Sequence, residues 1–229
     1  MDFSAFEKKI DTTFKNKDLL RTAFTHRSYL NENRKSGMEH NERLEFLGDA
    51  VLELATSMYL YTSLPEAQEG ELTSFRSSLV KTTTLARVAR SLHLGEKLRI
   101  SKGEEASNGR ENDAILADTL EAYIGALYLD QGYKAAETFL SQELFPLFDE
   151  IKNFNLQRDS KSQLQEFVQK TRKRLPVYKV VEASGPDHSK LFTVAVVVDG
   201  KEVARADGKS KQDAQQDAAK KALEILGGK

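Results

Sequence analysis

Hydrophobic residues recur every three or four positions through most of the first 150 residues, which is the spacing of helices that bury one face. The helix expected over residues 41–61 has one such stripe, and we expect it to pack into the protein interior. Its members are Leu44, Leu47, Val51, Leu54 and Met58. Further helices are expected over residues 70–94, 112–129 and 134–151, with a polar loop lacking core residues over 101–111. The first domain, residues 1–151, is therefore predicted to be all-α.

A different pattern begins after a predicted linker at residues 152–158. The elements expected there are a helix over 161–170, strands over 176–181, 191–198 and 201–206, and a helix over 214–226. Asp199-Gly200 is a strong signal for a hairpin turn between the last two strands. The second domain, residues 159–229, is therefore predicted to be a small α+β unit in the order α-β-β-β-α.

Acidic residues follow a helical spacing beside two of the apolar stripes. Glu42, Glu45 and Asp49 stand at i, i+3 and i+7, so they share one face of a helix, and Asp118 and Glu121 stand at i and i+3 of another. A solvated acidic surface is one interpretation of each group. If the two helices lie together, the five carboxylates could instead converge into a pocket for a hard divalent cation such as Mg²⁺.

The amino-acid composition limits the kinds of catalytic and binding site that the chain can contain. The 229-residue chain has no cysteine, which excludes disulfides, thiolate metal sites and a cysteine nucleophile. Residues 1–152 hold 19 Lys and Arg against 25 Asp and Glu, a net charge of −6, whereas residues 153–229 hold 15 against 10, a net charge of +5. The basic second domain therefore favours a polyanionic partner. The amino terminus does not resemble a secretory signal, and the longest apolar run of the second domain, Val194–Val198, is too short to span a membrane, so we expect a cytoplasmic protein.

Three features of the second domain stand out: polar residues outside the first helix, a histidine in the loop between strands, and lysines at the start of the last helix. They are Gln165 and Glu166, His188, and Lys209 and Lys211. With this arrangement the second domain resembles the double-stranded RNA-binding domain. A helix start also favours phosphate through its free N–H groups and dipole. The resemblance implies contacts with successive minor grooves and the phosphates between them. Gln212 and Gln215 stand where this family has further basic residues, which points to modest phosphate affinity.

Two stretches of the first domain contain its helical acidic groups: residues 41–49, Asn-Glu-Arg-Leu-Glu-Phe-Leu-Gly-Asp, and residues 116–122, Leu-Ala-Asp-Thr-Leu-Glu-Ala. The first stretch resembles the signature of the ribonuclease III family, and the second resembles the second acidic motif of that family. Thr25-His26-Arg27-Ser28 and Glu69-Gly70 match further positions. The resemblance covers nearly the whole chain, in the bacterial order of one nuclease domain followed by one RNA-binding domain.

This resemblance implies Mg²⁺-dependent cleavage of double-stranded RNA by a homodimer, with Mn²⁺ able to substitute for Mg²⁺. It implies two-metal phosphodiester hydrolysis that leaves 5′-phosphate and 3′-hydroxyl ends with short 3′ overhangs, in ribosomal RNA precursors and structured messenger RNA. The implied metal ligands are Glu45, Asp49, Asp118 and Glu121, of which Asp49 and Glu121 are also the implied catalytic residues. Glu42 and Glu69 are expected to line the catalytic valley and position RNA, Phe46 to enter a pocket of the partner subunit, and His26 and His40 to be structural.

Two other functions stay open at this point. A catalytically silent RNA-binding protein or chaperone would use the first domain only for dimerisation, although intact acids at all four ligand positions argue against such a protein. A phosphohydrolase of small nucleotides would use the acidic site but would have no need for the second domain.

Overall fold

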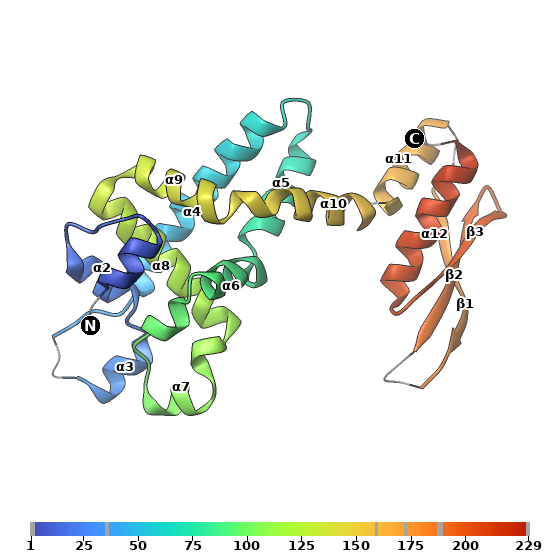
Figure 1. Cartoon of the computed structure of the whole chain (residues 1–229). Helices are drawn as coiled ribbons and strands as arrows, with labels where there is room; N and C mark the ends of the chain where they lie inside the picture. Colours follow the sequence, from blue (N-terminus) through green and yellow to red (C-terminus); the bar gives the residue numbers. More distant parts are fainter. Residues whose placement is uncertain (1–2, 35–36, 159, 172–173, 187–189, 228–229) are drawn as a thin grey trace. The chain divides into compact units, whose positions relative to one another are not determined.

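The chain folds into two compact units that divide after Ile151. The computed structural model describes residues 3–34, 37–158, 160–171, 174–186 and 190–227, and Figure 1 shows its helices and strands. No helix among these residues is long and apolar enough to cross a membrane.

The described residues of the first unit are mainly helical, and its last helix continues past Ile151, where the two units divide. In chain order its α-helices are α1 (Ser4–Lys9), α2 (Lys17–Ala23), α3 (Arg27–Glu32), α4 (Glu42–Ser63), α5 (Glu69–Val80), α6 (Thr82–Ser91), α7 (Lys102–Ala106), α8 (Asp113–Gln131), α9 (Tyr133–Glu143) and α10 (Phe148–Arg158). Short 3₁₀ turns η1 (Leu94–Lys97), η2 (Gly109–Glu111) and η3 (Phe145–Leu147) join some of them. The all-α prediction is confirmed for this unit, and the predicted linker at residues 152–158 lies within α10.

Helix α8 is the centre of the core. Most of its residues from Ile115 to Leu127 are buried, because apolar side chains occur on every face of the helix. Asn112 caps its start, with its side-chain oxygen accepting hydrogen bonds from the backbone N–H groups of Ala114 and Ile115. Helix α4 packs against α8 more extensively than any other pair of helices in the described part of the unit. The two acidic motifs therefore lie on two helices that are in direct contact.

The contact between α4 and α8 depends on two glycines. A Cβ atom built on Gly48 of α4 would lie 1.8 Å from the Glu121 carbonyl oxygen, and one on Gly125 of α8 would lie 2.2 Å from the Leu44 carbonyl oxygen. Both positions therefore accept only hydrogen on Cα, and the two backbones approach more closely than other residues would permit. Because Gly48 stands between Glu45 and Asp49, this crossing also decides where the acids lie.

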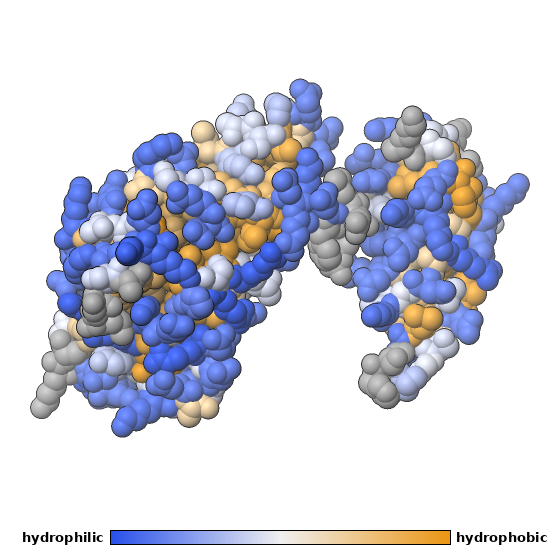
Figure 2. Space-filling view, in the orientation of Figure 1, coloured by the Kyte–Doolittle hydropathy of each residue, from blue (hydrophilic) through white to orange (hydrophobic). Residues whose placement is uncertain are grey.

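The predicted apolar stripe of α4 is partly wrong. Leu44 and Val51 are buried, but Leu54 and Met58 are 54% and 49% exposed. The buried side of the second half of the helix is formed instead by Leu52, Ala55, Thr56 and Leu60. The exposed apolar residues of α4 form a separate line on its surface, which we call the outer stripe: Phe46, Ala50, Leu54, Met58 and Tyr61. Figure 2 shows hydrophobic side chains at the surface where α4 passes beside α9 in Figure 1.

Two other sequence predictions need correction. The single helix expected over residues 70–94 is two helices, α5 and α6, separated by Lys81, whose backbone is extended. The expected loop at 101–111 contains α7 and η2, and Gly109 is buried there. Short helices of this kind lack the run of apolar positions on which the prediction depended.

The second unit has the predicted order of elements. Its helix α11 (Ser160–Thr171) is followed by β1 (Val177–Ser184), β2 (Leu191–Val198), β3 (Lys201–Gly208) and α12 (Lys211–Leu226). The sheet is antiparallel in the order β1-β2-β3. Leu164 and Val168 of α11 and Ala218 of α12 share a core with Val196 of β2. Asp199 and Gly200 both have positive φ, 51° and 77°, which confirms the predicted hairpin turn.

We expect Gly48→Ala to destabilise the first unit, because its methyl group would force α4 away from α8. Overpacking of this kind costs about 1–3 kcal/mol, which urea unfolding followed by circular dichroism measures. Gly70→Ala is the matched control, since a Cβ atom at this helical glycine meets nothing within 4 Å. Equal unfolding free energies for the two variants would contradict the close crossing.

Candidate metal and RNA sites

Helices α4 and α8 bring three of the four predicted metal ligands together. Glu45, Asp118 and Glu121 each offer a carboxylate oxygen, and these oxygens lie within 4.8 Å of one another. We call these three residues the acidic cluster. All three residues are partly buried, so the cluster is not a fully solvated face. Carboxylates at this spacing offer the oxygen ligands that Mg²⁺ and Mn²⁺ prefer.

The charges of the acidic cluster are not balanced by nearby donors. Burial, and then repulsion from neighbouring carboxylates, raises the pKa of Glu121 to about 8. The same two causes raise the pKa of Glu45 to about 7, and burial also raises the pKa of Asp118. Within the described part of the chain, neither these three carboxylates nor that of Asp49 accepts a hydrogen bond or forms an ion pair. A bound cation would relieve this repulsion, so the donor set fits a divalent metal.

Asp49, the fourth predicted ligand, lies at the edge of the cluster. It is exposed and stands one helical turn after Glu45. Among the neighbouring charges, Asp49 has the largest effect on the pKa of Glu121. Its carboxylate therefore lies close enough to add to the negative field, although it is outside the group of three oxygens within 4.8 Å.

Glu42 and Glu69, the two residues predicted to line the catalytic valley, do not lie together in the structure. Glu42 lies beside the cluster, where it raises the pKa of Glu45 and pairs with Arg27 at 3.4 Å between Oε1 and Nη1. Glu69 begins α5, after the far end of α4, and accepts a hydrogen bond from the Thr73 hydroxyl at 3.1 Å. That end of α4 is about 27 Å from Glu45 by the helical rise. Glu69 is therefore not part of the acidic cluster of its own chain.

Gly48 and Gly125 are not among the site residues predicted from the sequence, although they determine the separation of the two acidic helices. The sequence did contain one signal for these two residues. Each is a glycine inside a long predicted helix, where glycine lowers helix stability by about 1 kcal/mol relative to alanine. A residue with that cost inside a helix often marks close packing.

The predicted RNA-binding residues lie on the exposed surface of the second unit. Gln165 and Glu166 are exposed on α11, and Lys209 and Lys211 are exposed at the start of α12. The Lys211 ammonium lies 5.8 Å from the centre of the Phe192 ring. Ser210 caps α12 by accepting a hydrogen bond from the Asp213 backbone N–H. His188 lies outside the described residues.

Gln215, one of the two glutamines at expected basic positions, has a structural contact. Its side-chain oxygen accepts a hydrogen bond from the Lys161 ammonium at 2.7 Å, and the neighbouring Gln216 accepts one from the Lys161 backbone N–H at 3.0 Å. These bonds join the start of α11 to α12. Gln212 is exposed.

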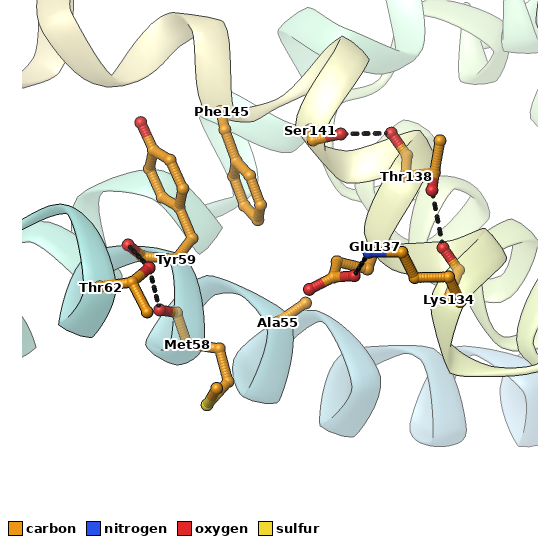
Figure 3. A pocket seen from close by; sticks show the side chains of 9 residues that line it. All are labelled: Ala55, Met58, Tyr59, Thr62, Lys134, Glu137, Thr138, Ser141 and Phe145. Atoms are coloured by element: carbon orange, nitrogen blue, oxygen red, sulfur yellow. Dashed lines mark hydrogen bonds and ion pairs between the residues drawn. The ribbon is translucent and has the colours of Figure 1, made fainter.

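A cavity of about 240 Å³ opens on the side of α4 that faces α9. Figure 3 shows the Tyr59 ring beside the Phe145 ring, and the stacked ring centres are 4.2 Å apart. The Lys134 ammonium pairs with Glu137 at 2.6 Å on another side of the cavity. Met58 of the outer stripe also lines this cavity, so the stripe reaches its edge.

Family models match both units. A model described as ribonuclease-III-like matches residues 16–147, and one described as a double-stranded RNA-binding motif matches residues 160–226. Together with the acidic cluster between α4 and α8, these matches define the class of protein. It is a helical nuclease that carries a double-stranded RNA-binding domain.

Comparison with individual proteins identifies the family to which the chain belongs. The chain is 49% identical over 221 residues to the Ribonuclease 3 of Streptococcus thermophilus, covering 96% of each chain. It is 48% identical to the Ribonuclease 3 of Geobacillus thermodenitrificans, covering 98% of this chain and 91% of that one. The solved nuclease domain of Campylobacter jejuni ribonuclease III is 38% identical with a TM-score of 0.59, covering 63% of this chain and 97% of that one. The chain belongs to the ribonuclease III family and is an endoribonuclease acting on double-stranded RNA.

The raised pKa values predict that stabilisation of the protein by a divalent cation such as Mg²⁺ would depend on pH. Without metal, Glu45 and Glu121 keep their protons when folded but lose them near 4.5 when unfolded, so stability falls as pH rises from 4.5 to about 8. A cation replaces these protons. We therefore expect Mg²⁺ to raise the melting temperature more at pH 8.5 than at pH 6, measured by differential scanning calorimetry. An equal increase at both pH values would contradict this linkage.

Proposed function

We propose that the chain hydrolyses double-stranded RNA in a Mg²⁺-dependent reaction, with Mn²⁺ able to replace Mg²⁺. The products are 5′-phosphate and 3′-hydroxyl ends with short 3′ overhangs. The observation that carries the proposal is the convergence of Glu45, Asp118 and Glu121 without any described hydrogen-bond donor to their carboxylates. Ribosomal RNA precursors and structured messenger RNA are the proposed substrates, since such RNAs contain A-form duplexes recognised by shape.

Each acid has a proposed part in this site. Glu45, Asp118 and Glu121 hold the metal ions, and Asp49 completes the set from the exposed edge. Bound Mg²⁺ would supply Lewis acidity and lower the pKa of water at the site. Glu121 is the central ligand of the proposal, because burial and then the charges of the other three acids raise its pKa. Glu42 adds negative charge beside the cluster. Its ion pair with Arg27 holds the Arg27 guanidinium group at the edge of the proposed catalytic valley.

The second unit is the proposed anchor for the duplex. Gln165 and Glu166 of α11 supply polar groups for a minor groove, while Lys209 and Lys211 add charge to the N-terminal end of α12. His188 is the proposed contact with a second minor groove. The net charge of +5 over residues 153–229 favours this role, because phosphate contacts supply much of the affinity for nucleic acid.

The outer stripe of α4 is the proposed contact between two copies of the chain. Phe46 and Tyr61 are 80% and 70% exposed, and an apolar line of this length is unusual on the surface of a monomer. The related nuclease domain from Campylobacter jejuni has a structurally flexible region that is involved in dimer formation. We propose a homodimer with a two-fold axis at the middle of the stripe, between Ala50 and Leu54.

This symmetry pairs the two ends of the stripe. When the two α4 helices run antiparallel, Phe46 of one copy lies opposite Met58 of the second copy. Met58 lines the cavity beside α9. We propose that the Phe46 ring enters this cavity. The same arrangement brings the far end of one α4 next to the acidic end of the other, so Glu69 would reach the catalytic valley of the second copy. It accounts for the distance between Glu69 and the acidic cluster within one chain.

Glu121→Gln tests the proposed reaction, because it keeps the shape of the side chain and removes its charge. We expect cleavage of a long RNA duplex in Mg²⁺ to fall by about 100-fold or more. Mutation of a residue that only hydrogen-bonds to a metal ligand already lowers metal affinity or activity by about 10–100-fold. Duplex binding, measured by filter retention in EDTA, should stay within a few-fold. Glu224→Gln, at an exposed position of α12, is the control. Full cleavage by Glu121→Gln, or by the unaltered protein in EDTA, would overturn the proposal.

Phe46→Ala tests the proposed dimer. Loss of a ring that fills a pocket weakens association by about tenfold or more, which sedimentation at low protein concentration would detect. Ile225→Ala removes a comparably exposed side chain, 64% exposed, from the second unit and should leave the assembly unchanged. A Phe46→Ala variant that sediments like the unaltered protein at every concentration counts against the stripe as the interface.

A further inference from the structure

Lys161 is a positive charge between the two helices of the second unit. It stands in the first turn of α11, which packs against α12 (Figure 1). Its ammonium donates a hydrogen bond of 2.7 Å to the Gln215 side-chain oxygen and lies 4.9 Å from the centre of the Tyr178 ring. Its backbone N–H donates to the Gln216 side-chain oxygen at 3.0 Å. Residues of α12 and β1 therefore hold this charge in place.

The contacts of Lys161 orient its ammonium but do not neutralise it. An amide oxygen and an aromatic ring carry no formal charge, and no carboxylate of the described residues forms an ion pair with Lys161. An ammonium group has three N–H donors, of which the bond to Gln215 uses one. Because Lys161 is only partly buried, its other donors are available to an anionic group outside the chain.

The neighbours of Lys161 along both helices belong to the proposed RNA-binding surface. Gln165, a proposed minor-groove contact, stands four positions after Lys161 and therefore on the same side of α11. Gln215 stands four positions after Lys211, a proposed phosphate contact, and so shares its side of α12. The hydrogen bond from Lys161 to Gln215 joins these two sides. Since Gln215 is neutral, the positive charge at this point of α12 comes from Lys161.

We propose that the Lys161 ammonium binds a phosphate of the RNA duplex, between the minor-groove contact of α11 and the phosphate contact of α12. Gln215 and Tyr178 orient the ammonium for this contact. The inference rests on the proposed role of the second unit as the anchor for the duplex, to which it adds one phosphate contact. Such a contact depends on charge and not on RNA sequence, so the salt dependence of binding measures it.

Binding of an RNA duplex by the full chain in EDTA, measured over a series of salt concentrations, tests this contact. Lys161→Met keeps an unbranched apolar side chain beside the Tyr178 ring and removes the charge. We expect it to weaken binding several-fold at about 0.15 M salt and to lower the slope of log Kd against log salt concentration by about one. A purely structural role of Lys161 would instead lower the melting temperature and leave this slope unchanged.

Lys220→Met is the matched control. Lys220 is exposed and stands nine positions after Lys211, which places it on the opposite side of α12. We expect its salt slope to equal that of the unaltered protein.

An exchange of the two hydrogen-bonded residues separates charge from packing. The double variant Lys161→Gln with Gln215→Lys retains an ammonium and an amide at the same junction of α11 and α12, so we expect it to restore the slope. An unchanged slope in Lys161→Met, an equal decrease in Lys220→Met, or a low slope in a stably folded double variant would overturn the inference. Unaltered protein that binds no duplex at any salt concentration would instead contradict the proposed anchor itself.

Discussion

The acidic site depends on the close approach of α4 and α8 at Gly48 and Gly125. Each glycine Cα faces backbone of the other helix, with no room for a Cβ atom on either side. The motif that contains Glu45 and the motif that contains Glu121 are far apart in the sequence, and this crossing makes them one site. The rest of the first unit supports the crossing, because α8 is buried along most of its length and cannot shift without disturbing the core.

The same crossing creates an electrostatic cost that a bound cation would relieve. Folding places several carboxylates together and partly excludes water, which raises the pKa of Glu45, Asp118 and Glu121. Most buried acids in proteins are paired with a base or accept hydrogen bonds. In the described residues these three have neither, so the fold keeps a negative cluster that favours divalent cations over protons as pH rises.

Much of this organisation could be predicted from the sequence, because it depends on local patterns. Helical spacing placed Glu45 with Asp49 and Asp118 with Glu121, and the Asp199-Gly200 pair placed the hairpin of the second unit. Sequence spacing could not show that Leu54 and Met58 face outward, because an apolar stripe looks the same whether it packs inside the chain or against another molecule. It also could not place Glu69, whose distance from the cluster depends on how α5 folds back after α4. The hydrogen bond from the Ser101 backbone N–H to the Ser28 hydroxyl joins segments far apart in the sequence and has no local signal.

Anomalous X-ray scattering from a crystal grown with Mn²⁺ would test the acidic cluster most directly. We predict an anomalous peak at about 2 Å from carboxylate oxygens of Glu45, Asp118 and Glu121. The peak should disappear in crystals of Glu121→Gln that retain the α4–α8 crossing. A cluster without a peak at saturating Mn²⁺, or a Mn²⁺ ion bound only by other carboxylates of the chain, would contradict the assignment of the acidic cluster as the metal site.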